Sequence, residues 1–224
     1  MLFDEWEPVY EQILKDLDID RMSDEASARL LKMLTLNSDI IQEEGLFKII
    51  GKDVAVAGGN ISEDDIGILK ELRSSGRTII SAGSATDVLL TNHLIPDIVV
   101  TDLDGDIGMQ KKASASGAVT FVHAHGDNAH LITEHMKDMK GRIIITTQSA
   151  PDMILCNFGG FTDGDRAVCT ARHFGAKNIT LVGFDMDNPS DKPGTDPGMK
   201  RKKLQWAKKI ILDMNPSDVT IISL

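Results

Sequence analysis

Short apolar runs alternate with amphipathic segments along most of this chain, and the alternation predicts the fold. Runs of β-branched and other apolar residues predict strands, and segments whose apolar residues recur every three or four positions predict helices. The expected strands are 53–57, 78–81, 98–100, 118–122, 142–146, 178–182 and 219–222. Strands that alternate with helices in this way predict an α/β fold with a doubly wound, mostly parallel sheet and right-handed crossovers.

The N-terminal part of the chain has a different pattern, which predicts a small N-terminal helical segment. Apolar residues from Trp6 to Leu17 recur at helical spacing, and Ser23 is the expected N-cap of a second helix. Residues 40–51 fit either a short hairpin or an irregular connection. We therefore divide the chain into a helical segment over residues 1–50 and an α/β domain over residues 51–224. We expect the helices to pack against this domain or against a second subunit, and the sequence is compatible with a homodimer.

The expected strand over residues 98–100 ends in a run of acidic residues. Asp102, Asp104 and Asp106 follow it at every second position. At the carboxyl end of a parallel strand, Asp102 and Asp104 can both face the crevice in which open α/β sheets bind ligands. Paired carboxylates suit Mg²⁺, which usually takes one or two of them together with substrate phosphates. A polar turn with Asp106 as a helix cap is the simpler interpretation, but mutual repulsion among three acids favours a metal or phosphate role.

A second polar cluster follows the expected strand over residues 118–122. It contains His123, His125 and Asp127. Because both strands belong to the predicted sheet, we expect Asp127 to join the paired aspartates as a metal-binding and catalytic residue. The two histidines are expected to donate hydrogen bonds to phosphate or to orient their neighbours. A closed zinc site would need a fourth ligand, and no thiol-rich sequence lies nearby.

Two small-residue turns follow other expected strands and are candidate phosphate-binding loops. They are Gly58-Gly59-Asn60 and Gly83-Ser84. Such turns bring backbone N–H groups and a helix N-terminus towards a phosphate. The chain contains neither a Walker motif nor a complete GxGxxG sequence, so each turn taken alone is equally an ordinary strand-to-helix connection.

Charged residues mark the start of two further helices. Arg166 lies in the first turn of one helix, where it opposes the helix dipole, so we expect it to have an anionic partner such as phosphate. Asp163 precedes it and is a natural N-cap. Residues 186–199 are rich in Pro, Gly and Asp and could form a lid. The basic run that follows, which includes Lys203, either reaches phosphate when this lid closes or is a solvated helix face.

The composition narrows the range of partners. The chain has 224 residues, a net charge of −10 at pH 7 and a single Tyr, a combination that argues against nucleic-acid binding. No apolar run is as long as a membrane span, and the acidic N-terminus does not fit a signal peptide. We therefore expect a cytoplasmic protein that binds no membrane, with Cys156 and Cys169 as reduced thiols.

Four polar motifs, taken in order, resemble those of one enzyme family. They are PDIVVTDLDG at 96–105, HAHGDN at 123–128, GFTDGDR at 160–166 and GFD at 183–185. The set is similar to that of the archaeal-type 6-hydroxymethyl-7,8-dihydropterin pyrophosphokinases, which are distantly similar to thiamin pyrophosphokinase. The resemblance implies a fold like the thiamin pyrophosphokinase catalytic domain. It also implies transfer of pyrophosphate from ATP to a pterin hydroxymethyl group, with Mg²⁺ as cofactor and AMP as product, in tetrahydromethanopterin or folate-type biosynthesis.

The resemblance also implies roles for individual residues. By position, Asp102 and Asp104 match the paired metal-binding aspartates of the thiamin enzyme, and Asp127 matches the acid that opens its next helix. Residues 51–224 would then be a nucleotide-binding catalytic domain with ATP and a pterin as its ligands. Attack on the β-phosphorus of ATP needs charge neutralisation and in-line positioning, so no Ser or Cys nucleophile is required.

One position departs from the pattern of the thiamin enzyme. That enzyme has an Asp before its Gly-Gly turn, where this chain has Ala82. One of its metal ligands is therefore missing here, and thiamin is not the expected substrate. In the third motif, we assign Asp163 and Asp165 to the substrate.

Three other functions fit the acidic strand end. The sequence from Val99 to Gly105 resembles the first motif of haloacid-dehalogenase-like phosphatases, although that motif normally opens the fold and continues Gly-Thr. A metal-dependent glycosyltransferase would use Asp102 and Asp104 to hold a nucleotide sugar. A nucleotide-sensing module would bind the same ligand without turnover.

Overall fold

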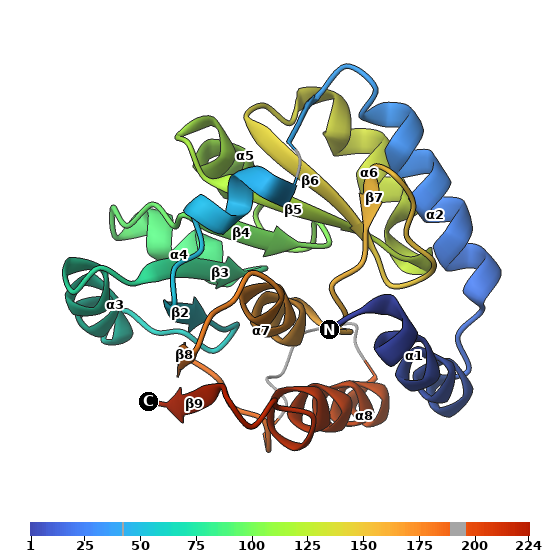
Figure 1. Ribbon diagram of the computed structural model, residues 1–224. Helices are drawn as coiled ribbons and strands as arrows, with labels where there is room; N and C mark the ends of the chain where they lie inside the picture. Colours follow the sequence, from blue (N-terminus) through green and yellow to red (C-terminus); the bar gives the residue numbers. More distant parts are fainter. Residues whose placement is uncertain (42, 189–195) are drawn as a thin grey trace.

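The apolar runs of the sequence pair into one parallel sheet with helices on both faces (Figure 1). The computed structural model describes residues 1–41, 43–188 and 196–224. Within these residues the sheet has nine strands, all paired in parallel. They are β1 (Asp39–Ile40), β2 (Asp53–Ala57), β3 (Thr78–Ala82), β4 (Ile98–Thr101), β5 (Val119–Ala124), β6 (Arg142–Thr147), β7 (Leu155–Cys156), β8 (Asn178–Val182) and β9 (Thr220–Ser223). The predicted doubly wound α/β fold is confirmed.

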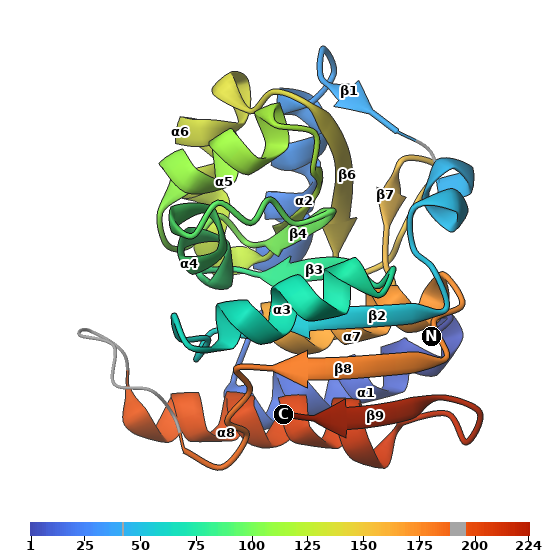
Figure 2. The ribbon, with the colours of Figure 1, turned by 90° about the vertical axis from the view of Figure 1, so that its left-hand side faces the viewer.

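The strand order places a topological switch point beside β2. The order is β1-β6-β5-β4-β3-β2-β8-β9, and β7 pairs with β6. From β2 the chain adds strands in one direction as far as β6, then crosses back to place β8 and β9 on the other side of β2. Figure 2 shows β2, β8 and β9 side by side with their carboxyl ends at the same edge. Open α/β sheets bind ligands at such a point, outside the carboxyl ends of the strands.

Alternate residues of each strand face two different layers of helices. Residues such as Val56, Ile80 and Val100 pack under α7, whereas Ala55, Ile79 and Val122 face the opposite layer. The α-helices are α1 (Phe3–Leu17), α2 (Arg21–Leu34), α3 (Asp65–Ser74), α4 (Ala85–Thr91), α5 (Ile107–Ala115), α6 (Ala129–His135), α7 (Asp163–His173) and α8 (Pro197–Lys208). Short 3₁₀ segments cover Glu43–Lys48, Gly126–Asn128 and Met136–Asp138, and a π-helical turn, Lys209–Asp213, extends α8.

Two local predictions need correction. The second helix begins at Arg21, because Asp20 is its N-cap and accepts the Met22 N–H at 3.0 Å; Ser23 lies in the first turn. The predicted hairpin alternative for residues 40–51 is wrong, because β1 is an edge strand parallel to β6 and a 3₁₀ segment follows it. Half of the lid expected over residues 186–199 falls on 189–195, which lie outside the described residues, and its last three residues already belong to α8.

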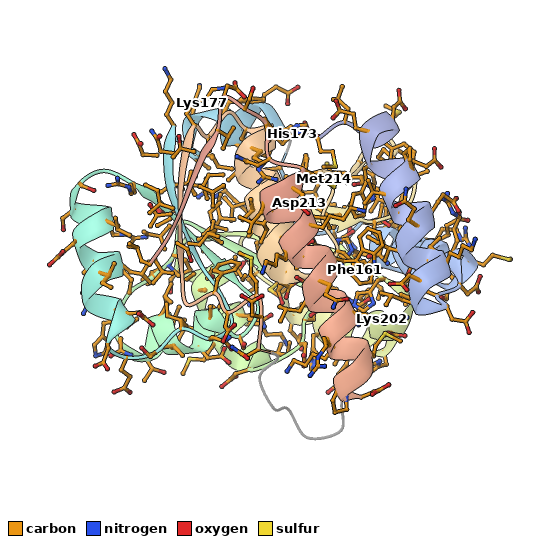
Figure 3. All side chains as sticks on the ribbon, turned by 90° about the horizontal axis from the view of Figure 1, so that it is seen from below. Phe161, His173, Lys177, Lys202, Asp213 and Met214 are labelled. Carbon is orange, nitrogen blue, oxygen red and sulfur yellow. The ribbon has the colours of Figure 1, made fainter. Side chains whose placement is uncertain are left out.

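The N-terminal helices share the core of the α/β layers. Trp6 and Tyr10 of α1 pack in one cluster with Phe161 and Ile210, and α2 packs on β5 and β6. The boundary drawn at residue 50 therefore separates segments that are packed together. Seen from below (Figure 3), α8 crosses this face of the molecule with Phe161 beside it. Among the described helices, none combines the length and apolar character needed to cross a membrane.

Candidate active site

A cavity of about 450 Å³ opens along the carboxyl edge of the sheet, at the switch point. Its walls come from the loops after β2, β3, β4, β5 and β8, from the start of α7, and from α8 and the start of α2. Most of the sequence-predicted site residues meet there. Those lining the cavity are Gly59, Asn60, Gly83, Ser84, Asp102, Asp104, His125, Asp127, Asp163, Asp165, Arg166 and Lys203.

A strained turn after β4 presents the paired aspartates to the cavity. Leu103, between them, is fully buried and has a left-handed φ of 70°, a conformation that costs a non-glycine residue energy. Its N–H donates to Thr101 Oγ1 at 2.8 Å, and the Asp104 N–H donates to Asp102 Oδ1 at 3.1 Å. Gln110 Nε2 donates to the Asp104 carbonyl at 2.7 Å. The buried Leu103 thus anchors a loop whose flanking carboxylates line the cavity.

Asp102 is held between the ends of two neighbouring strands. Its Oδ2 lies 3.3 Å from His125 Nε2, and Asn128 Nδ2 bridges the main-chain carbonyls of Asp102 at 2.8 Å and His123 at 2.7 Å. Burial alone would raise the pKa of Asp102, but the His125 hydrogen bond and the nearby charges of His125 and Arg166 lower it below its ordinary value. Asp102 is therefore an anion in this cavity.

Asp163 brings a second, partly buried carboxylate to the same place from α7. Its Oδ2 lies 2.7 Å from the position that a Cβ on Gly83 would take, and Gly83 has a φ of +52°, so this turn requires glycine. Burial and the charge of Asp102 raise the pKa of Asp163 well above its ordinary value. Arg166 Nη1 donates to Asp163 Oδ1 at 3.2 Å and opposes this shift. The partner that the structure gives Arg166 at this end is the carboxyl group of Asp163.

The start of α7 corrects two predicted roles. The N-cap is Thr162 and not Asp163. Asp165, which we assigned to the substrate, accepts the Phe161 N–H at 2.8 Å, the Thr162 N–H at 2.6 Å and a short hydrogen bond from Thr162 Oγ1. Both of its carboxylate oxygens are thus used to begin the helix. Asp163 is left as the carboxylate of this motif that can act in the cavity.

Two of the predicted phosphate-binding residues lie away from the cavity. Gly58 is packed tightly, since a Cβ there would lie 2.6 Å from the Phe184 ring and 2.7 Å from the Gly183 carbonyl oxygen. His123 is 2% exposed, and its Nδ1 pairs with Thr146 Oγ1 at 3.0 Å. It belongs to β5 and faces the interior, so it cannot donate to a phosphate in the cavity from this position. Burial and the Arg166 charge lower the pKa of His123 well below its ordinary value.

The buried imidazole of His123 is expected to make stability depend on pH. It stays neutral in the folded protein, whereas in the unfolded chain it takes up a proton with a pKa of about 6.5. The free energy of unfolding should therefore fall as pH drops below about 6.5, with a slope for this group of up to about 1.4 kcal/mol per pH unit. Denaturant unfolding of the wild type and His123→Gln between pH 5 and pH 8 measures this slope. A stability difference between the two proteins that is constant over this range would contradict the prediction.

Three residues that line the cavity lie outside the four sequence motifs. Ser23 and Asp24 reach it from α2, and Gln148 reaches it from the loop after β6. None of the four motifs lies in the N-terminal segment. Acidic residues are common in the first turn of a helix, so the sequence around Asp24 does not indicate a functional role. Phe161 and Phe184 form apolar walls of the cavity. Their place in the site could be predicted from the sequence, because each lies inside one of the four motifs.

Comparisons with known proteins agree with the sequence resemblance. A family model described as "6-hydroxymethylpterin diphosphokinase MptE-like" matches residues 38–191. A relative from Pyrococcus furiosus is 40% identical and covers 94% of this chain and 93% of its own length. Another, from Methanocaldococcus jannaschii, is 36% identical and covers 92% of this chain and 93% of its own length. Both relatives are named 6-hydroxymethyl-7,8-dihydropterin pyrophosphokinase.

A solved structure supports the fold alone. The Maf glycosyltransferase from Magnetospirillum magneticum matches with a TM-score of 0.51 and 16% identity, over 78% of this chain and 34% of its own length. The family match covers the acidic strand end, the histidine cluster and the start of α7, and each of the two relatives covers more than nine-tenths of the chain. This chain therefore belongs to the MptE-like 6-hydroxymethylpterin diphosphokinase family.

Proposed function

We propose that this protein transfers the pyrophosphoryl group of ATP to the hydroxymethyl group of 6-hydroxymethyl-7,8-dihydropterin and releases AMP. The names of its relatives support the acceptor and the group transferred. The observation that carries the proposal is the meeting of Asp102, Asp163 and Arg166 at the switch point of the sheet. Phosphoryl-group transfer needs charge neutralisation and in-line positioning, and this site supplies charged groups of both signs around one cavity.

The acidic side chains of the cavity fit a magnesium ion. The charge of Asp102 raises the pKa of the partly buried Asp163, so a divalent cation nearby would relieve their repulsion. Within the described residues, no group of three or more His, Cys, Asp or Glu side chains is arranged as a ready metal site. That suits Mg²⁺, which takes one or two carboxylates and completes its shell with phosphates and water. Asp102 and Asp104 would hold the ion, which would neutralise the charge of the transferred phosphates, and Asp127 lines the same cavity.

The chain itself would bind the triphosphate with backbone and basic groups. The turn of Gly83 and Ser84 lines the cavity at the start of α4, where backbone N–H groups suit anionic oxygens. Arg166 would contact phosphate oxygens from the start of α7, and Lys203 from α8. These positive groups matter because the protein carries a net charge of −10, which repels a free nucleotide.

The apolar part of the cavity suits the flat ring of a pterin. Phe161, Phe184 and Leu204 line it, and Lys203 Nζ lies 5.9 Å from the centre of the Phe161 ring. Cavities for small ligands are mostly apolar with a few placed polar groups, and a volume of about 450 Å³ lies in their usual range. A ring held there would direct its hydroxymethyl group towards Asp102 and Asp163.

The test is the formation of AMP that depends on the acceptor. The protein is incubated with ATP and Mg²⁺, with and without 6-hydroxymethyl-7,8-dihydropterin, and the nucleotides and pterins are separated by chromatography. We expect AMP and a pterin diphosphate in equal amounts, formed only when all three components are present. Thiamin in place of the pterin should give neither product, as Ala82 in the cavity wall leads us to expect.

Other outcomes would overturn the proposal. Phosphate released from a generic ester would indicate a phosphatase, and hydrolysis or transfer of a nucleotide sugar would indicate a glycosyltransferase. Saturable ATP binding without any product, at pterin concentrations that also bind, would indicate a sensor.

A further inference from the structure

A buried carboxylate of the N-terminal helices, Asp24, lines the cavity together with Gln148; we call these two residues the rear wall. Asp24 of α2 is 1% exposed and lies outside the 38–191 range matched by the family model. Its Oδ2 accepts the Tyr10 hydroxyl at 2.5 Å and Gln148 Nε2 at 2.7 Å, and its Oδ1 accepts the Gly126 N–H at 2.7 Å. A buried carboxylate needs such donors, and here all three come from different parts of the chain.

The hydrogen bond between Asp24 and Gln148 fixes which way the Gln148 amide faces. Arg166 Nη2 donates to Gln148 Oε1 at 3.1 Å. A guanidinium has only donors, so the atom that faces it must be the amide oxygen. The NH₂ group then points away from Arg166 and needs an acceptor, which the Asp24 carboxylate supplies. With a donor in place of the Asp24 oxygen, the amide could not satisfy both neighbours.

The chain of contacts continues to the carboxylates of the site. Arg166 Nη1 donates to Asp163 Oδ1 at 3.2 Å, and Asp163 interacts with Asp102. Gln148 itself is 2% exposed, and its carbonyl accepts the Trp6 indole N–H at 2.9 Å, so its backbone is also tied to α1. Arg166 therefore has one fixed partner on each side, Gln148 towards the N-terminal helices and Asp163 towards the cavity.

We propose that Asp24 and Gln148 are positioning residues: Asp24 sets the orientation of the Gln148 amide, and Gln148 holds the Arg166 guanidinium where it meets the nucleotide phosphates. This rests on the proposed function, because it gives Arg166 a phosphate partner. It assigns a role in the site to the N-terminal helices, which contain none of the four sequence motifs.

The test measures whether these residues act through Arg166. The variants are Gln148→Met, which keeps the side-chain length but has no amide, and Asp24→Asn, each made in the wild type and in an Arg166→Gln background. Calorimetry measures the dissociation constant for α,β-methylene-ATP with Mg²⁺, an analogue whose α–β bond cannot be broken. We expect Gln148→Met to weaken binding about tenfold in the wild type, the loss typical of a hydrogen bond to a charged group, and less than about twofold without Arg166.

Asp24→Asn should also weaken binding more in the wild type than in the Arg166→Gln background, but the difference between the two backgrounds should be smaller than for Gln148→Met. An asparagine cannot accept from both Gln148 and Gly126, so part of its effect reaches the loop at Gly126 and remains when Arg166 is absent. Asp20→Asn is the matched control, because Asp20 is an exposed N-cap of the same helix and asparagine caps equally well. It should bind the analogue like the wild type.

Equal losses in both backgrounds would overturn the proposal, because they would show that Asp24 and Gln148 act on stability alone. Thermal melting of every variant checks that it is folded, and Gln148→Met keeps the test available if Asp24→Asn does not fold. The readout needs no pterin, so a protein that binds the analogue but makes no AMP would contradict the proposed function and leave the positioning result standing. A wild type that binds neither the analogue nor inorganic pyrophosphate would overturn both.

Discussion

Replacing Asp102 by asparagine is expected to lower turnover by at least about a hundredfold, the usual loss when a charge contact to a transition state is removed. Asp102 is held as an anion by His125 at 3.3 Å, and it lies where β4 ends at the cavity. The asparagine keeps the shape and one oxygen, so the hydrogen bond from the Asp104 N–H survives. Steady-state assay of AMP formation gives the loss, and it should not be restored by millimolar Mg²⁺.

The fold of this variant should be intact, but the protein without ligands should be less stable than the wild type. Removing the Asp102 charge relieves its repulsion of Asp163, but it also removes the interactions with His125 and Arg166 that lower the pKa of Asp102, so the melting temperature near neutral pH should fall. Asp106→Asn is the matched control: Asp106 belongs to the same acidic run but only caps α5, where its Oδ1 accepts the Met109 N–H at 3.1 Å. Asparagine caps as well, so activity should be unchanged. Wild-type turnover in Asp102→Asn would exclude the residue from the site.

Replacing Arg166 by glutamine should also cost about a hundredfold in turnover, and it should weaken nucleotide binding. Arg166 is 6% exposed and donates to both Asp163 and Gln148, so its charge is fixed in place beside the carboxylates. A fixed guanidinium lowers the cost of bringing phosphate into an acidic cavity, whereas a neutral amide does not. Initial rates at several ATP concentrations separate the effects on kcat and KM.

Arg172 provides a control on the same helix. Its guanidinium donates to the main-chain carbonyls of Ile210 and Ile211, where it stabilises the π-helical turn after α8; Ile211 lines the cavity, but Arg172 itself does not. Arg172→Gln should therefore lower the melting temperature and leave turnover per folded molecule close to that of the wild type. If Arg166→Gln and Arg172→Gln lowered activity equally, the role of Arg166 would be structural.

The parallel sheet was predictable because each of its central strands is a short apolar run that can be recognised within a single segment of sequence. Val54 to Ala57 and Ile98 to Val100 are apolar runs buried on both faces, and carboxylates at the end of the second run mark the edge that binds ligands. The turn at Asp102 was predictable for the same reason. Such signals are local, so a single segment of sequence contains them.

The rear wall of the site was not predictable, because its residues meet only in three dimensions. Asp24 and Gln148 are 124 residues apart, and neither lies in a motif. The phosphate-binding role predicted for His123 was wrong for a different reason. β5 extends to Ala124, two residues beyond the predicted end, so His123 lies inside the sheet, whereas His125 lines the cavity. A strand boundary misplaced by two residues changes the chemistry assigned to a histidine.

The packing of the two ends of the chain against each other has a consequence for folding. Trp206 Nε1 of α8 donates to Asp16 Oδ2 of α1 at 3.0 Å across 190 residues of sequence, and Trp6 reaches Gln148 across 142. Contacts between residues so far apart in sequence give a high contact order, which slows folding. During synthesis α1 leaves the ribosome first, but it cannot bury Trp6 and Tyr10 until the second half of the chain has followed. We therefore expect the N-terminal helices to be among the last elements to dock, and a nascent chain that lacks α8 to expose an aromatic helix face prone to aggregation.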